Sequence, residues 1–153
     1  MLEIGTMTQQ IDAEPTRGLR RKPMLIAGWL AAFTATLHLF GGTPTLRPML
    51  DAAIKEDLQL LLYACWHGIS LVLAFSAAAF LVAARSGTAT RHHSMIMMTS
   101  ILWVAFGVVF IGVALLMSGP RMLLTLSQWS LLLPVGAIGL YGASAGPRPL
   151  VGA

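Results

Sequence analysis

The sequence predicts an all-α polytopic membrane protein, a bundle of four transmembrane helices. Four apolar stretches, 23–42, 58–84, 94–118 and 122–143, are each long enough to cross a hydrocarbon core of about 30 Å, which takes about 20 helical residues. Charged residues make up only 10% of the chain, whereas about 25% is typical of a soluble domain. Because lipid offers no partner to backbone N–H and C=O groups, these stretches are expected to be helices.

The rest of the sequence divides into tails and short loops. Residues 1–22 are expected to form a disordered basic tail, 23–143 the membrane domain, and 144–153 a short second tail. No Ala-x-Ala pattern follows the first apolar stretch, so we expect it to be retained as an anchor rather than cleaved. Four spans with short loops leave no length for a soluble catalytic domain, which favours a protein that is not an enzyme.

The distribution of positive charge predicts the orientation. Seven Lys and Arg residues fall on the side of the two tails and the 85–93 loop, and three fall on the opposite side. The seven are Arg17, Arg20, Arg21, Lys22, Arg85, Arg91 and Arg148, and the three are Arg47, Lys55 and Arg121. The positive-inside rule therefore places both termini in the cytoplasm and the chain in the inner membrane of the cell. Because the net charge of +4 sits at the span ends, we expect contact with the lipid bilayer and no nucleic-acid partner.

Small residues predict how the spans pack and where they end. Lipid supplies no hydrophobic force between helices, so close approach through small side chains is the usual solution. We expect the face bearing Ala27, Ala31, Thr34 and His38 to turn inward, and Gly136, Gly139 and Gly142 to give the fourth span a close-packing face. If part of this glycine face stays exposed, a helix of a membrane-protein partner or of a second copy of the chain (a homo-oligomer) could pack closely against it. The sequence Gly41-Gly42-Thr43-Pro44 is expected to end the first helix.

His38 and His67 are the main ionisable side chains inside the apolar stretches, where such groups are functional candidates by default. At 1.5 Å per helical residue, His38 lies roughly 6 Å, Gln128 roughly 8 Å and His67 about 13 Å below the outer ends of their spans. Tyr63 and His67 share one helix face because they are four residues apart. Antiparallel neighbours can therefore bring His38, Tyr63, His67, Ser127 and Gln128 into one layer in the outer half of the bundle.

Three interpretations of this polar layer remain open. In the first it is structural, with side chains that hydrogen-bond across helices for about 0.6 to 2 kcal/mol each. In the second it binds a cofactor, either haem b with His38 and His67 as axial ligands or a quinone headgroup held by His and by Tyr63 or Gln128. In the third it forms a proton or metal path, although the spans hold no carboxylate and only one thiol, Cys65. The sequence favours a ligand-binding or accessory subunit, with a redox protein as the alternative.

Other chemistry-bearing motifs are missing from the sequence. It has no Gly-rich phosphate loop, no Gly-x-Ser-x-Gly elbow and no Cys-x-x-Cys pair. His92 and His93 are adjacent, so on a helix they diverge by about 100° and do not face one metal site. Contact with lipid headgroups is the expected role of this pair.

Two short motifs resemble those of a known group of proteins. The segments Leu37-His38-Leu39-Phe40-Gly41-Gly42 and Cys65-Trp66-His67-Gly68 are similar to segments of small uncharacterised bacterial inner-membrane proteins with four spans. The shared pattern is a Leu-His before a Gly-rich turn and a Trp-His in the next helix, and it covers the first half of the chain. The resemblance implies that both histidines belong to one site, and it carries no known reaction.

Overall fold

The computed structural model describes residues 19–51, 55–85 and 92–144, and every regular element within these ranges is a helix. The elements are α1 (Arg21–Thr36), the π-helix η1 (Leu37–Gly42), α2 (Thr43–Asp51), α3 (Glu56–Arg85), α4 (His93–Met117), α5 (Met122–Thr125) and α6 (Trp129–Ala143). The expected tails, 1–22 and 144–153, lie mostly outside the described residues. For the residues that are described, the all-α prediction is confirmed.

Three of the helical stretches are long enough and apolar enough to cross a membrane. They are Arg21–Gly42, Glu56–Arg85 and His93–Met117, and they correspond to the first three expected spans. Large apolar side chains such as Trp29, Phe75 and Leu116 are exposed on their outer surfaces. Such surfaces suit a hydrocarbon environment, as the low charge content of the sequence predicts. α6, with 15 residues, is shorter than these three.

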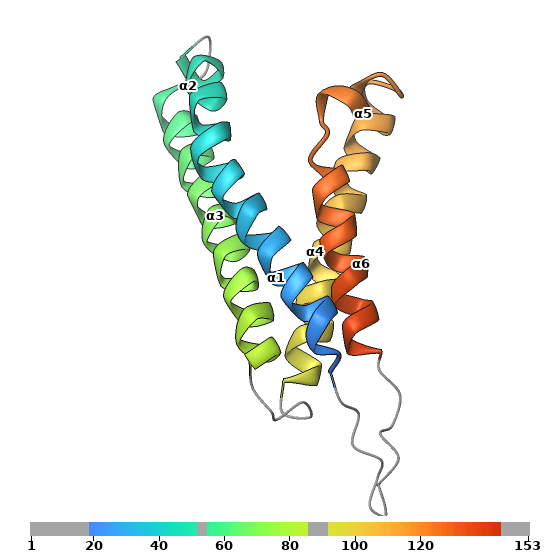
Figure 1. Cartoon of the computed structure of the whole chain (residues 1–153). Coiled ribbons are helices and arrows are strands. Elements are labelled where there is room, and N and C mark those ends of the chain that lie inside the picture. Colours follow the sequence, from blue (N-terminus) through green and yellow to red (C-terminus); the bar gives the residue numbers. More distant parts are fainter. Residues whose placement is uncertain (1–18, 52–54, 86–91, 145–153) are drawn as a thin grey trace, which may run out of the picture.

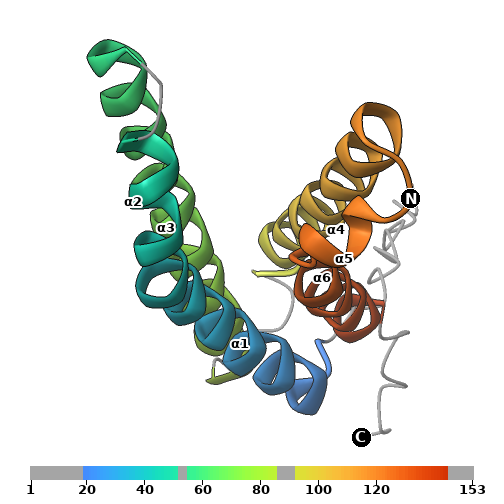
Figure 2. The same cartoon turned by 90° about the horizontal axis from the view of Figure 1, so that it is seen from above.

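The helices form two arms that meet at one end and spread apart at the other (Figures 1 and 2). The first arm contains α1, η1, α2 and α3, and the second contains α4, α5 and α6. α1 packs along α3, α4 packs along α6, and α1 also contacts α6 where the arms join. We call the joined end the closed end and the spread end the open end.

Small residues allow the helices to approach closely at the closed end. A Cβ added to Gly139 would lie 2.3 Å from Ser100 Oγ, and one added to Gly142 would lie 2.0 Å from Met24 Cε. Ala27, Ala31 and Thr34 are buried on the predicted inner face of α1. Phe80 and Trp103 fill the space between the helix pairs, with exposures of 0% and 1%. The predicted small-residue faces on α1 and α6 are therefore confirmed as packing surfaces.

The two ends of the described chain meet at the closed end. The backbone N–H of Arg20 donates to the carbonyl of Gly142 over 2.9 Å. The Arg20 guanidinium lies 4.6 Å from the ring centroid of Tyr141 and donates a hydrogen bond to its hydroxyl. His93 Nε2 lies 3.0 Å from the carbonyl oxygen of Ala143, which is left unpaired by the end of α6. These contacts join the beginnings of α1 and α4 to the end of α6.

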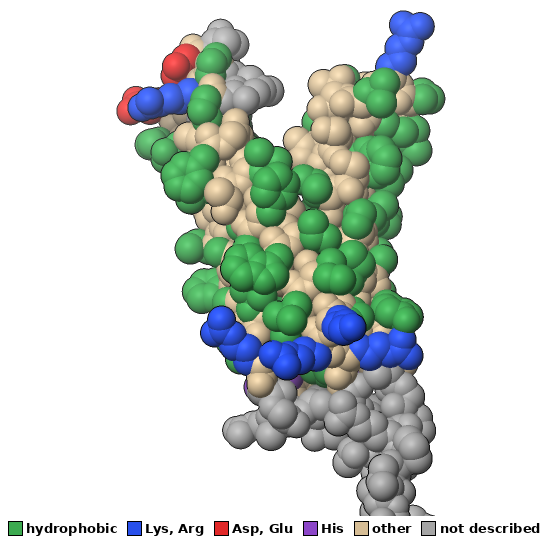
Figure 3. Space-filling view, in the orientation of Figure 1, with side chains coloured by type: hydrophobic (Ala, Val, Ile, Leu, Met, Phe, Trp, Pro, Cys, Tyr) green, Lys and Arg blue, Asp and Glu red, His purple; other side chains and the backbone are tan. Residues whose placement is uncertain are grey.

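Charge differs between the two ends of the molecule (Figure 3). The closed end carries a band of described cations, and the open end carries cations and carboxylates together. The closed-end residues are Arg20, Arg21, Lys22 and Arg85, and the open-end residues are Arg47, Asp51, Lys55, Glu56, Asp57 and Arg121. Because all described carboxylates lie at the open end, the positive excess of the described residues belongs to the closed end.

The first helix does not end at the Gly-Gly-Thr-Pro sequence, so that expectation is wrong. The chain passes from α1 through η1 directly into α2, and Thr43 Oγ1 hydrogen-bonds to the carbonyl of Leu39. Pro44 lies inside this continuous helical stretch, where it donates no backbone N–H to the preceding turn. The glycines serve contact rather than termination, because a Cβ on Gly42 would lie 2.3 Å from Trp66 Cζ2.

The expected fourth span, 122–143, is not one continuous helix. It is divided into α5 and α6 by residues 126–128, and Leu126 has φ −92° and ψ 62°, outside the helical region. Trp129 Nε1 donates to the carbonyl of Leu123 over 3.0 Å and so bridges the break. Ser130 Oγ donates to the carbonyl of Ser127 over 2.7 Å on the α6 side. These side chains replace part of the interrupted helical hydrogen bonding.

Candidate functional site

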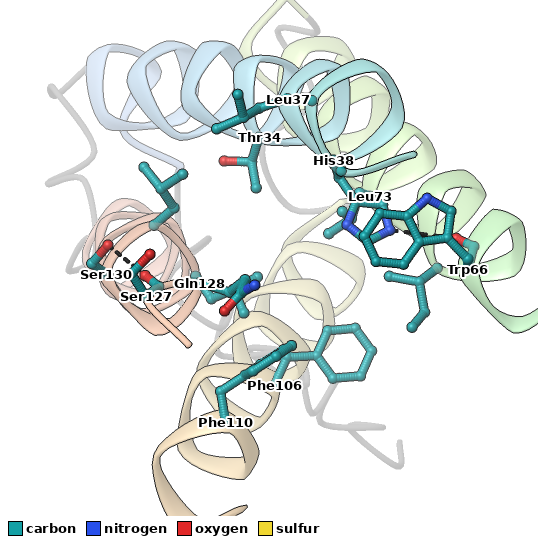
Figure 4. Close-up of a pocket in the computed structure, with 15 residues that line it drawn as sticks. Thr34, Leu37, His38, Trp66, Leu73, Phe106, Phe110, Ser127, Gln128 and Ser130 are labelled. Atoms are coloured by element: carbon teal, nitrogen blue, oxygen red, sulfur yellow. Dashed lines mark hydrogen bonds between the residues drawn. The ribbon is translucent and has the colours of Figure 1, made fainter. Parts of the chain in front are cut away.

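A pocket of about 410 Å³ lies between the two arms, toward the open end (Figure 4). Most of its wall is apolar or aromatic, with a few polar groups, as is usual for a small-molecule site. The first arm contributes Thr34, Leu37, His38, Gly41, Gly42, Trp66, Ile69 and Leu73. The second arm contributes Phe106, Phe110, Ser127, Gln128, Ser130, Leu131 and Leu132.

On the first arm, the pocket is bounded by the π-helix η1. A π-helix shifts the hydrogen-bond register by one residue and frequently occurs at functional sites. Leu37, His38, Gly41 and Gly42 all belong to η1 and all line the pocket. The altered register therefore determines which side chains of the first arm face the cavity.

On the second arm, the pocket is bounded by the break between α5 and α6. Ser127 and Gln128 lie within the break, and Ser130 follows in the first turn of α6. Non-helical backbone at membrane depth is tolerated where it is buried in protein or lines a cavity. The pocket thus has an irregular helical segment on each side.

His38 is held against Trp66 from the neighbouring helix. The two rings are stacked, with centroids 3.8 Å apart and planes inclined by 19°. His38 Nε2 lies 3.4 Å from the carbonyl oxygen of Trp66, which also accepts a hydrogen bond from Ser70 Oγ over 3.0 Å. The Trp66 Nε1 atom is buried and has no hydrogen-bond partner among the described residues. The stack fixes both rings at the edge of the cavity.

Gln128 faces this pair from the opposite wall. In Figure 4 its amide points from the α5–α6 break toward His38 and Trp66. The amide offers two N–H donors and one carbonyl acceptor. Thr34 Oγ1 donates to the carbonyl of Leu30 over 2.8 Å, so its oxygen keeps only an acceptor role toward the cavity. The polar groups of the pocket therefore occupy both walls and surround an otherwise apolar space.

The structure divides the predicted polar layer into two parts. His38, Ser127 and Gln128 line one pocket, as the depth argument predicts for them. His67 and Tyr63 pack against each other instead, edge to face, with ring centroids 4.4 Å apart, and neither lines the pocket. His67 is half-buried and Tyr63 is exposed. The helical spacing predicted their shared face but not the direction of that face.

The described residues offer little to a metal ion. No group of three or more His, Cys, Asp or Glu side chains is arranged to hold a metal within residues 19–51, 55–85 and 92–144. Cys65 is exposed rather than buried within the spans. Bis-histidine ligation of haem would need His38 and His67 on one cavity, and only His38 lines the pocket.

Sequence reasoning missed the role of Trp66 and of the two backbone irregularities. The motif Cys65-Trp66-His67-Gly68 does not predict that Trp66 stacks on His38. The glycine pair in 41–42 carried the signal, since a missing Cβ marks a position that another group approaches closely.

The described chain is helical, with three helices long and apolar enough to span a membrane and a pocket between its two arms. The chain matches no protein-family model, and no similar curated protein or solved structure was found.

Proposed function

We propose that this chain is a non-enzymatic integral membrane protein that binds a small amphiphilic molecule in the pocket between its arms. In this proposal it crosses the inner membrane four times, with α5 and α6 together forming the fourth crossing. The closed end, with its cationic band, faces the cytoplasm. The protein acts as a ligand-binding or accessory subunit within the membrane.

One observation carries the proposal: two helix irregularities on different arms border the same cavity. A π-helix and a helix break each weaken regular backbone hydrogen bonding, which is costly in lipid. η1 and the α5–α6 break nevertheless lie opposite each other, and both supply pocket residues. A purely structural bundle would gain stability from continuous helices at these positions. A cavity that must present polar groups to a ligand accounts for both.

The composition of the wall indicates the kind of ligand. Leucine, isoleucine, phenylalanine and tryptophan side chains make up eight of the fifteen lining residues, and His38, Gln128 and the hydroxyl groups provide the polar contacts. A molecule with an apolar body and a small polar head satisfies both surfaces. Such molecules are available within the bilayer and can reach a cavity between spread helices.

Between the two cofactor alternatives, the wall favours a quinone-type ring over haem b. His38 and Gln128 on opposite walls can hydrogen-bond the oxygens of a ring compound, whereas haem would need a second axial ligand. A reduced-minus-oxidised absorption spectrum of the protein purified from cells given a haem precursor separates the two. We expect no Soret shift and no sharp α and β bands.

The test of ligand binding compares the native protein with a variant whose pocket is filled. Ser127→Phe puts a large side chain on the pocket wall, and Ser118→Phe makes the same change at an exposed serine outside the lining. After purification in mild detergent, bound small molecules are extracted and measured by mass spectrometry. We expect one amphiphile to accompany the native protein and Ser118→Phe, and to fall at least about fivefold in Ser127→Phe. Equal retention by Ser127→Phe would refute a ligand in this pocket.

A further inference from the structure

The hydrogen bond made by His38 determines what its other nitrogen can do. The Trp66 carbonyl oxygen can only accept, so the 3.4 Å contact is a hydrogen bond in the tautomer of His38 that carries its proton on Nε2. In the neutral imidazole, Nδ1 then carries a lone pair and is an acceptor only. In Figure 4 this second nitrogen lies on the side of the ring that faces the pocket. The first-arm wall therefore offers the ligand an acceptor, not a donor.

An acceptor at this place selects for a ligand that carries a hydroxyl group. A hydroxyl donates to Nδ1, and its oxygen can still accept from the Gln128 amide on the opposite wall. A carbonyl oxygen at the same position would face the Nδ1 lone pair and leave it without a partner. A site built to hydrogen-bond a hydroxyl discriminates strongly against the analogue that lacks it.

The aromatic wall favours a flat ring as the bearer of that hydroxyl. The stacked pair of His38 and Trp66 lies on one side of the cavity, and Phe106 and Phe110 lie on the other (Figure 4). Aromatic rings pack well in edge-to-face and offset arrangements against such side chains. The leucine and isoleucine side chains of the lining suit an apolar tail.

We infer that the pocket recognises the reduced, hydroxyl-bearing form of a lipid-soluble ring compound, a quinol, in preference to the oxidised quinone. This inference rests on the proposed ligand-binding function and adds the redox form of the ligand. It involves binding alone, with no electron or proton transferred by the protein. The preference is set by the tautomer of His38, which the Trp66 carbonyl holds.

Three probes with the same ring and a decyl tail test this inference: a benzoquinol, its benzoquinone, and the quinol with both hydroxyls methylated. Each is titrated calorimetrically, without oxygen, into the protein in lipid nanodiscs, and empty nanodiscs correct for partitioning. We expect the quinol to bind about tenfold more tightly than the other two, which is the range for leaving one buried acceptor unpaired. The methylated probe separates the hydroxyl from the shape of the reduced ring.

Two substitutions at His38 and one control test whether the preference for the quinol comes from the His38 acceptor. His38→Phe keeps a flat ring without an acceptor, and we expect quinol affinity to fall to that of the quinone. His38→Asn puts an amide near the position of Nδ1 and should keep part of the preference. His67→Phe makes the matched change outside the pocket lining and should keep all of it.

The outcomes separate this inference from the proposed function. Quinone binding as tight as quinol binding in the native protein, or an unchanged preference in His38→Phe, would overturn the quinol inference. If neither ring compound binds while the co-purified amphiphile is still lost in Ser127→Phe, the inference is wrong and the proposed function stands. If Ser127→Phe retains that amphiphile, the proposed function itself fails.

Discussion

Gly42 of η1 lies against the indole of Trp66 in α3, with no room for a side chain between them. A Cβ built on Gly42 would lie 2.3 Å from Trp66 Cζ2 and 2.6 Å from Cη2. Both distances are shorter than two non-bonded carbon atoms can approach, so the two groups would clash. Trp66 in turn carries His38, stacked on its indole. The absence of one side chain on η1 therefore sets the position of both aromatic rings at the pocket wall.

Gly42→Ala should displace the Trp66 indole and disturb the pocket. Overpacking of this kind costs about 1 to 3 kcal/mol, and we expect a lower midpoint of thermal unfolding in detergent together with weaker ligand retention. Gly68→Ala is the control, because a Cβ there meets no atom within 4 Å. A Gly42→Ala protein as stable and as well loaded as Gly68→Ala would show that the contact does not position Trp66.

Gly136→Ala should separate α4 from α6. The added Cβ would lie 2.8 Å from both Ser100 O and Val104 N, which are backbone atoms of α4 and cannot turn aside as a side chain can. We expect destabilisation at the upper end of about 1 to 3 kcal/mol, measured by thermal unfolding. Gly112→Ala is the control, because Gly112 also lies in the second arm, in α4, and a Cβ there meets no atom within 4 Å. This variant should unfold as the native protein does.

His93→Phe should weaken the closed end. The change removes the contact of His93 Nε2 with the Ala143 carbonyl, 3.0 Å away, and leaves the last turn of α6 without this partner. We expect a loss of about 1 kcal/mol in the free energy of unfolding. His92→Phe alters the neighbouring side chain, which is not part of that contact, and should cost less. The contact gives His93 a role at the end of a helix beside the headgroup contact expected of the histidine pair, which stays a prediction.

Cysteine labelling should give opposite results at the two ends of the molecule. In a Cys65→Ser background, Ser118→Cys lies between α4 and α5 at the open end, and Arg85→Cys ends α3 at the closed end. With both termini cytoplasmic, a membrane-impermeant maleimide added to cells with a permeable outer envelope should label Ser118→Cys. Arg85→Cys should react only after the inner membrane is opened. The reverse pattern would overturn the proposed orientation.

Periodicity and length predicted the helices because the bilayer imposes simple requirements. A span must be apolar, about 20 residues long and internally hydrogen-bonded, and all three properties can be counted along the sequence. The stretches around 23–42, 58–84 and 94–118 accordingly became helices. The buried faces of α1 and α6 were also predictable, because small residues at helical spacing permit close approach.

The candidate site was predictable only in part. Counting residues from the outer ends of the spans placed His38, Ser127 and Gln128 at similar depths, and all three line one pocket. Depth says nothing about rotation around the helix axis, and rotation leaves His67 packed on Tyr63 and outside the pocket lining. The resemblance that joined the two histidines in one site rested on their order in the sequence, and it contained no information on that rotation.

The sequence by itself thus determined the helical class, the three long apolar helices and the small-residue faces, because each depends on local composition or spacing. Tertiary structure decided the rest. The π-helix at 37–42 exists where Gly42 meets Trp66, and the break at 126–128 lies where the second arm borders the cavity. Gly42 and Trp66 are far apart in the chain, as are the two walls of the cavity, and a local pattern cannot specify the partner of a contact. The pocket is a consequence of how two arms are placed, and only the folded chain defines that placement.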